Sequence, residues 1–127
     1  MRRVVALLLL ITATVSVARA EEPARKYIVY FQEWSAAVDG PAEGIIKEVA
    51  SMAQTRSGTL RIVGFADPTG SRKANILLSE LRAQRVVDLL ADAGVAPSRL
   101  VLSGKGAVEF AISSQEARRV EISFHHR

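Results

Sequence analysis

Residues 59–94 read TLRIVGFADPTGSRKANILLSELRAQRVVDLLADAG, and this stretch decides the fold. Apolar and polar residues alternate over residues 59–65, which predicts a half-buried strand. Turn-forming residues fill positions 67–71, and an amphipathic helix is predicted over residues 72–93, with Gly94 ending it. A strand that leads through a turn into a long helix is typical of a sheet with helices packed on it.

The segments on either side complete an alternating order of strands and helices. A short strand is predicted at residues 27–31, and an amphipathic helix follows, with Asp39 as its candidate cap. Two further strands are predicted at residues 99–103 and 118–124, with a loop at residues 104–116 between them. The order β-α-β-α-β-β predicts an α+β fold, a two-layer sandwich in which a small mixed sheet is covered on one face by two helices.

The N-terminal segment has the pattern of a secretory signal peptide. Two arginines precede an apolar run at residues 4–17, and Ala-Arg-Ala at residues 18–20 places small residues where a signal peptidase cleaves. As a helix, this run reaches only about 21 Å, which is short of the roughly 30 Å bilayer core. We therefore expect a cleavable signal peptide at residues 1–20, no transmembrane segment after cleavage, and a single domain at residues 21–127 with its core at about 27–124.

Charge and cysteine content restrict the partners and the compartment. The chain has 17 basic and 13 acidic side chains, but three of the basic ones lie in the predicted signal peptide, which leaves 14 against 13. A nucleic-acid-binding protein needs a net basic face, so nucleic acid is not an expected partner. The chain contains no cysteine, which excludes disulfides, thiol nucleophiles and a lipid-modified N-terminal cysteine. The absence of cysteine and the predicted signal peptide together predict a periplasmic protein.

The sequence contains no recognisable catalytic constellation. The two histidines, His125 and His126, lie at the C-terminal end, where chains usually fray, and no other metal ligands gather around them in the sequence. Residues 103–106, Ser-Gly-Lys-Gly, lack the glycine and the hydroxyl residue that complete a phosphate-binding loop. We therefore expect no enzymatic activity, no cofactor and no metal site.

The inward-facing stripe of the helix at residues 72–93 contains a charged residue. Arg82 lies among apolar positions, and Asn75 lies two turns earlier on the same stripe. A partly buried charge needs a partner, and Asp67, in the turn before the helix, is the nearest plausible acid. The other residues of the stripe are Leu78, Ser79, Ala83, Val86 and Leu90.

Two interpretations of Arg82 are open at this point. In one, it has a structural role and either pairs with Asp67 or extends to water. In the other, the carboxylate and the guanidinium form a pocket for a zwitterionic ligand. If the charge is kept for a ligand, Arg82→Leu should leave stability similar or higher, because apolar replacements of buried charges are often neutral.

Three short motifs are spaced as in a known family. GFADPTG at residues 64–70 is followed by Asn75 and by LSELRAQRV at residues 78–86. This spacing resembles the OmpA-like peptidoglycan-binding domain, of the type at the C-termini of OmpA and MotB, whose usual pattern is G-H-T-D-x-x-G, then N, then L-S-x-x-R-A-x-x-V. Residues 94–99 and 118–122 also match, so the resemblance extends over nearly all of the predicted domain.

The resemblance implies a non-catalytic cell-envelope module that binds peptidoglycan non-covalently through the diaminopimelate residue of the stem peptide. Asp67 would receive the ammonium of diaminopimelate and Arg82 its carboxylate. Asn75, Thr69 and Arg118 match positions that help to hold the ligand. The resemblance also implies association with the cell wall or the outer membrane, with other envelope proteins as further partners.

Several positions depart from the family pattern. Phe65 and Ala66 replace the usual His and Thr, Ala117 replaces Asn, and residues 30–35 lack an acid that is common in the family. These departures support an alternative, a divergent domain that acts as a periplasmic protein-interaction or assembly module with little peptidoglycan affinity. Phe65 and Trp34 are expected to pack in the core, and the competing interpretation is stacking on a cell-wall sugar.

Overall fold

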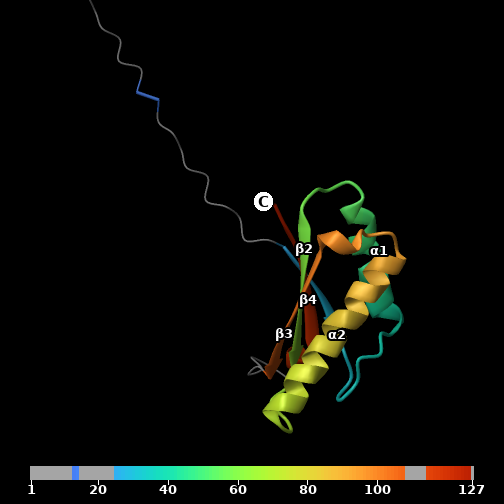
Figure 1. The fold of residues 1–127 in the computed structure, drawn as a ribbon, viewed down its shortest axis with the longest axis vertical. Helices are drawn as coiled ribbons and strands as arrows, with labels where there is room; N and C mark the ends of the chain where they lie inside the picture. The colour runs from blue at the N-terminus through green and yellow to red at the C-terminus, as the bar shows by residue number, and fades with distance from the viewer. Residues whose placement is uncertain (1–12, 15–24, 108–113, 127) are drawn as a thin grey trace, which may run out of the picture.

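The computed structural model describes residues 13–14, 25–107 and 114–126, and these form one four-stranded sheet with helices packed beside it (Figure 1). In chain order the elements are β1 (Lys26–Tyr30), α1 (Gly40–Ala53), β2 (Thr59–Ala66), α2 (Arg72–Asp92), the 3-10 helix η1 (Pro97–Arg99), β3 (Leu100–Ala107), α3 (Ser114–Ala117) and β4 (Arg119–His125). Apart from residues 13–14, the predicted signal peptide lies outside the described residues. None of the helices in the described part of the chain combines the length and apolar character needed to cross a bilayer.

The sheet has the order β1-β4-β2-β3, so the last strand of the chain lies between the first two. β4 is antiparallel to both of its neighbours, whereas β2 and β3 run parallel and are connected through α2. In Figure 1, α1 and α2 lie on the same side of the sheet. The predicted α+β sandwich, a small mixed sheet covered on one face by two helices, is confirmed.

Local signals begin and end the helices close to where the sequence predicts. Asp39 caps α1, because its Oδ1 accepts a hydrogen bond from the N–H of Ala42 at 2.9 Å. Ser71 caps α2 in the same way, accepting from the N–H of Ala74 at 3.1 Å. After α2 the chain turns at Gly94 with a φ of 100°, a left-handed conformation that glycine adopts without strain.

The core lies between the sheet and the two helices, and the buried face of α2 is the predicted stripe. Leu78 differs from the prediction in being only partly buried. The buried residues of α2 are Asn75, Ser79, Arg82, Ala83, Val86 and Leu90. The polar members of this set therefore occupy the N-terminal half of the helix, next to the turn that follows β2.

The third strand is longer than predicted, and the predicted loop at residues 104–116 is wrong in part. Residues 104–107 belong to β3, and all of α3 except Ala117 lies within the predicted loop. Gly104 is explained by packing, because a Cβ there would come within 2.7 Å of Oγ of Ser79. The N–H of Gly106 donates to the same oxygen at 2.9 Å. These glycines allow a helix to lie close to the strand, whereas glycine in a sequence usually suggests a turn.

Candidate functional site

Asp67 follows β2 directly, and its side chain is buried. The hydroxyl of Thr69 donates to Oδ1 of Asp67 at 2.9 Å, and Nη1 of Arg118 donates to Oδ2 at 3.3 Å. Arg118, which directly precedes β4, also donates from Nε to the carbonyl of Phe31 at 3.3 Å. A carboxylate removed from water needs such partners. The structure thus brings together Asp67, Thr69 and Arg118, three of the five predicted site residues.

Asn75, in the first turn of α2, faces the same cluster. Its Nδ2 donates to the carbonyl of Thr69 at 2.8 Å, and the residue is 2% exposed. Its Oδ1 is buried and accepts no hydrogen bond, and no other buried side-chain nitrogen or oxygen among the described residues lacks a partner. An unsatisfied buried acceptor costs about 1–3 kcal/mol, so this oxygen is suited to receive a donor from a ligand.

Arg82 is completely buried, and each of its guanidinium nitrogens donates to a backbone carbonyl. Nε donates to Ser35 at 2.8 Å, Nη1 to Phe65 at 3.0 Å and Nη2 to Gln32 at 2.9 Å. The guanidinium carbon also lies 5.4 Å from the centre of the Phe31 ring. Arg82 therefore connects α2 to the end of β2 and to the segment that follows β1.

The electrostatics of Arg82 reflect this burial. Burial lowers the pKa of Arg82 from its usual value to about 10, the carboxylate of Asp67 opposes this change, and Arg118 adds to the lowering. Arg82 is therefore charged at neutral pH.

The hydrogen-bond partners of Arg82 differ from those that the sequence suggested for a structural role. The sequence suggests pairing with Asp67 or extension to water, whereas the direct partners are carbonyls and the ion pair of Asp67 is with Arg118. Carbonyl dipoles replace the expected counter-charge because three of them point at one buried guanidinium. A contact between Arg82 and a ligand carboxylate stays a prediction.

Trp34 lies beside this cluster and is 52% exposed, so the expectation that it packs in the core is wrong. Its φ of 51° is left-handed, a conformation that costs a residue with a side chain about 1–2 kcal/mol. The indole lies against Gly70, in the turn between β2 and α2, where an added Cβ would come within 2.5 Å of Cη2 of Trp34. The sequence pointed to Trp34 but favoured core packing over stacking on a cell-wall sugar, although this tryptophan, the only one of the chain, follows two polar residues.

Phe65 and Ala117, which depart from the family pattern, occupy defined positions. Phe65 is only partly buried and lies outside the core, so the core-packing expectation is wrong here as well. Its ring packs under the guanidinium of Arg119, whose central carbon lies 4.2 Å from the ring centre. Ala117, the last residue of α3, is completely buried.

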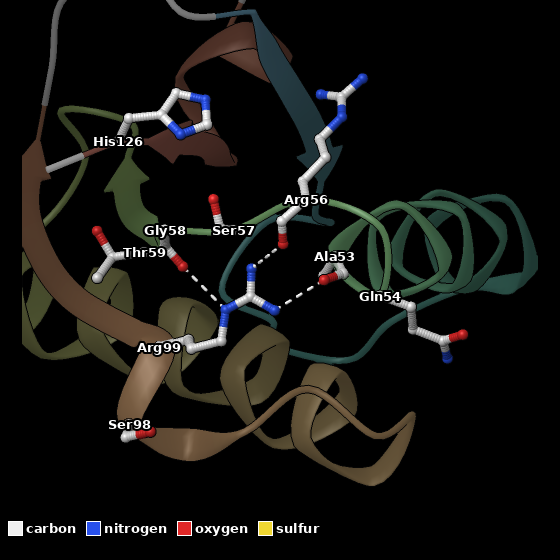
Figure 2. Close-up of a pocket in the computed structure, with 9 residues that line it drawn as sticks. All are labelled: Ala53, Gln54, Arg56, Ser57, Gly58, Thr59, Ser98, Arg99 and His126. Atoms are coloured by element: carbon white, nitrogen blue, oxygen red, sulfur yellow. Dashed lines mark hydrogen bonds between the residues drawn. The ribbon is translucent and has the colours of Figure 1, made fainter.

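A cavity of about 810 Å³ lies at the opposite end of β2 from Asp67 (Figure 2). Arg99 lines it, but its three guanidinium nitrogens donate to the carbonyls of Ala53, Arg56 and Gly58 at 2.7, 2.7 and 2.8 Å, as Figure 2 shows. Arg99 thus holds the loop between α1 and β2, as Arg82 holds the segment after β1. A second cavity, of about 350 Å³, lies between α1 and α2. Neither lining includes a predicted site residue, so the polar cluster at the end of β2, of which Asp67, Asn75 and Arg82 are buried, lies outside both cavities.

The histidines contribute to no metal centre within the described part of the chain. Nε2 of His125 lies 2.8 Å from the hydroxyl of Ser123, and His126 lines the larger cavity. No group of three or more histidine, cysteine, aspartate or glutamate side chains gathers among the described residues.

The sequence of this chain matches one family model and is similar to outer membrane proteins. The model of the OmpA family matches residues 30–122. Outer membrane protein 40 of Porphyromonas gingivalis is 36% identical over 83 residues, which cover 65% of this chain and 22% of that protein. Outer membrane protein A of Serratia odorifera is 34% identical over 59 residues, which cover 46% of this chain and 24% of that protein. The chain thus spans about a quarter or less of these relatives.

Comparison with solved structures gives domains of the same architecture. The C-terminal domain of Helicobacter pylori MotB matches with a TM-score of 0.71 at 25% identity, over 80% of this chain and 85% of that one. The peptidoglycan-associated lipoprotein from Burkholderia pseudomallei matches with a TM-score of 0.71 at 21% identity, over 77% of this chain and 89% of that one. The second match shows likeness of fold alone.

Proposed function

The chain belongs to the OmpA family, and from this we propose that it binds peptidoglycan non-covalently through the diaminopimelate residue of the stem peptide. OmpA-like domains are non-catalytic peptidoglycan-binding modules, which supports the general part of the proposal. The cluster around Asp67 supports the finer part, recognition of diaminopimelate.

The observation that carries the proposal is the unpaired Oδ1 of Asn75, a residue that shares Thr69 as a hydrogen-bond partner with the buried Asp67. The two are connected through Thr69, whose hydroxyl donates to Asp67 and whose carbonyl accepts from Asn75. An ammonium carries a positive charge and three N–H donors, so it satisfies a carboxylate and a free amide oxygen together. The free end of diaminopimelate supplies this group, with a carboxylate on the same carbon.

The carboxylate of the ligand requires a cation close to Asp67, and two arginines are candidates. The side chain of Arg118 is 16% exposed and already contacts Asp67. Arg82 is completely buried, and its nitrogens are engaged with the carbonyls of Gln32, Ser35 and Phe65. In this proposal Arg118 receives the carboxylate first, and a direct contact to Arg82 requires the segment after β1 to move.

The location follows from the same assignment. The relatives named above are outer membrane proteins, and the leader pattern at residues 1–20 predicts export. We place the protein in the periplasm, associated with the cell wall or the outer membrane. Other envelope proteins are further partners in this proposal.

Co-sedimentation with sacculi that contain diaminopimelate tests the proposal. The wild-type protein should pellet with the sacculi, and free diaminopimelate should release it. Asp67→Asn should lower the affinity at least tenfold, because a charge-assisted hydrogen bond is worth about 1.5–3 kcal/mol. Asp88→Asn, at an exposed position of α2, is the matched control and should pellet like the wild type.

Two outcomes contradict the proposal in different ways. If Asp67→Asn pellets like the wild type, the ligand does not bind at Asp67. If the folded wild-type protein stays in solution, the domain has little peptidoglycan affinity, and the alternative of a protein-interaction module is favoured.

A further inference from the structure

Trp34 combines exposure with a constrained backbone. Single exposed apolar residues are common on protein surfaces and mean little by themselves. Trp34, however, is 52% exposed and also has a φ of 51°. A bulky residue in the left-handed region persists only where its surroundings hold it there, and such positions gather at binding sites.

The surroundings hold Trp34 from two sides. Arg82 donates to the carbonyls of Gln32 and Ser35, which flank Trp34 in the chain. On the other side, Gly70 leaves the space in which the indole edge lies, because an added Cβ would come within 2.5 Å of Cη2. A completely buried arginine and a glycine thus keep an exposed aromatic ring in one place.

The ring also adjoins the proposed ligand site. Gly70 belongs to the same turn as Asp67 and Thr69, so the indole lies beside the turn that holds the proposed peptide subsite. In peptidoglycan the stem peptide is attached to a glycan strand of N-acetylated hexosamines. The apolar C–H face of such a sugar fits a flat aromatic surface, and the indole N–H is a donor for its hydroxyl or acetamido groups.

We propose that Trp34 is a sugar platform, which stacks on an N-acetylhexosamine of the glycan strand while the attached peptide binds at Asp67. The inference depends on the proposed function for the identity of the ligand. It adds a second subsite of a different chemistry, apolar and carbohydrate-directed, to the charged subsite at Asp67.

Calorimetric titration with three fragments of peptidoglycan tests this assignment. The fragments are the disaccharide with its stem peptide, the stem peptide without sugars, and the disaccharide without peptide. Trp34→Leu should weaken binding of the disaccharide-peptide about fivefold and leave binding of the sugar-free peptide within twofold. Trp34→Phe should retain most of the affinity, because it keeps a flat ring. Tyr30→Leu, at another exposed aromatic residue, should change neither affinity.

The fluorescence of the wild-type protein gives an independent measurement. Trp34 is the only tryptophan of the chain, so the disaccharide without peptide should change its emission directly. The platform is refuted if Trp34→Leu weakens both peptide ligands equally or weakens neither. If the wild type binds no peptide ligand, the proposed function fails, and an unchanged emission with the disaccharide then refutes the platform as well.

Discussion

The guanidinium of Arg82 makes three hydrogen bonds to backbone carbonyls, and two of these carbonyls, at Gln32 and Ser35, come from the segment after β1. A charged group removed from water costs several kcal/mol unless polar atoms replace its hydration. Here main-chain carbonyl oxygens replace the water around the guanidinium, and these oxygens also lose their own contact with water. The guanidinium and the carbonyls therefore satisfy each other's hydrogen bonds.

Arg82→Leu should lower the free energy of unfolding by about 3 kcal/mol, because the loss of the guanidinium leaves carbonyls unsatisfied. This reverses the expectation from sequence that stability stays similar or rises. Urea denaturation measures the effect. Arg85→Leu, at an exposed position of the same helix, is the control and should change stability by no more than about 0.5 kcal/mol. Equal stability of Arg82→Leu and the wild type would show that water reaches these carbonyls.

At the scale of elements, α2 lies unusually close to the sheet at its polar half. Gly64 in β2 faces the helix so closely that an added Cβ would overlap the carbonyl of Ser79. The same serine bonds to β3, where its Oγ accepts from the N–H of Gly106. The position of α2, and with it that of Asn75 and Arg82, depends on these small residues.

Gly64→Ala should destabilise the protein by at least about 3 kcal/mol, because the added methyl group overlaps helix backbone and not a flexible side-chain end. The matched control is Gly44→Ala in α1, where an added Cβ meets nothing within 4 Å. Since Gly44 lies inside a helix, alanine there should stabilise by about 0.5–1 kcal/mol. Thermal unfolding followed by circular dichroism measures both, and a Gly64→Ala protein as stable as the wild type would contradict the close approach.

For the whole molecule, the central position of β4 makes folding depend on the end of the chain. β1 pairs only with β4 among the described strands, and β4 also pairs with β2. β1 and β4 therefore pair although nearly the whole sequence of the domain separates them. Arg118, which precedes β4, reaches Asp67 only when this pairing has formed.

A chain that ends at residue 107 should not fold, because it lacks β4 and leaves β1 without a partner. Its circular dichroism should lack a cooperative thermal transition, and its proton NMR spectrum should lack dispersion. A chain that ends at His125 keeps β4 and should unfold like the full-length protein. A cooperative transition in the shorter chain would mean that β2, β3 and the two helices are stable by themselves.

Much of the fold could be predicted from the sequence, because its signals are local. The alternation at residues 59–65, the cap Asp39 and the glycine after α2 each act within a few residues. The family could also be predicted, since its motifs lie in one continuous stretch. The extension of β3 through Gly104 could not be predicted, because glycine is required there by the close approach of α2, about 25 residues earlier in the sequence.

The sequence by itself determined the order of the elements, the buried stripe of α2 and the membership of Asp67, Thr69, Asn75 and Arg82 in one motif. Only the tertiary structure decided how their polar groups are partnered. Arg82 bonds to carbonyls 17 to 50 residues away, and every residue carries such a carbonyl, so no side-chain pattern marks them. The exposure of Trp34 was decided in the same way, because it depends on the space at Gly70, in a distant turn.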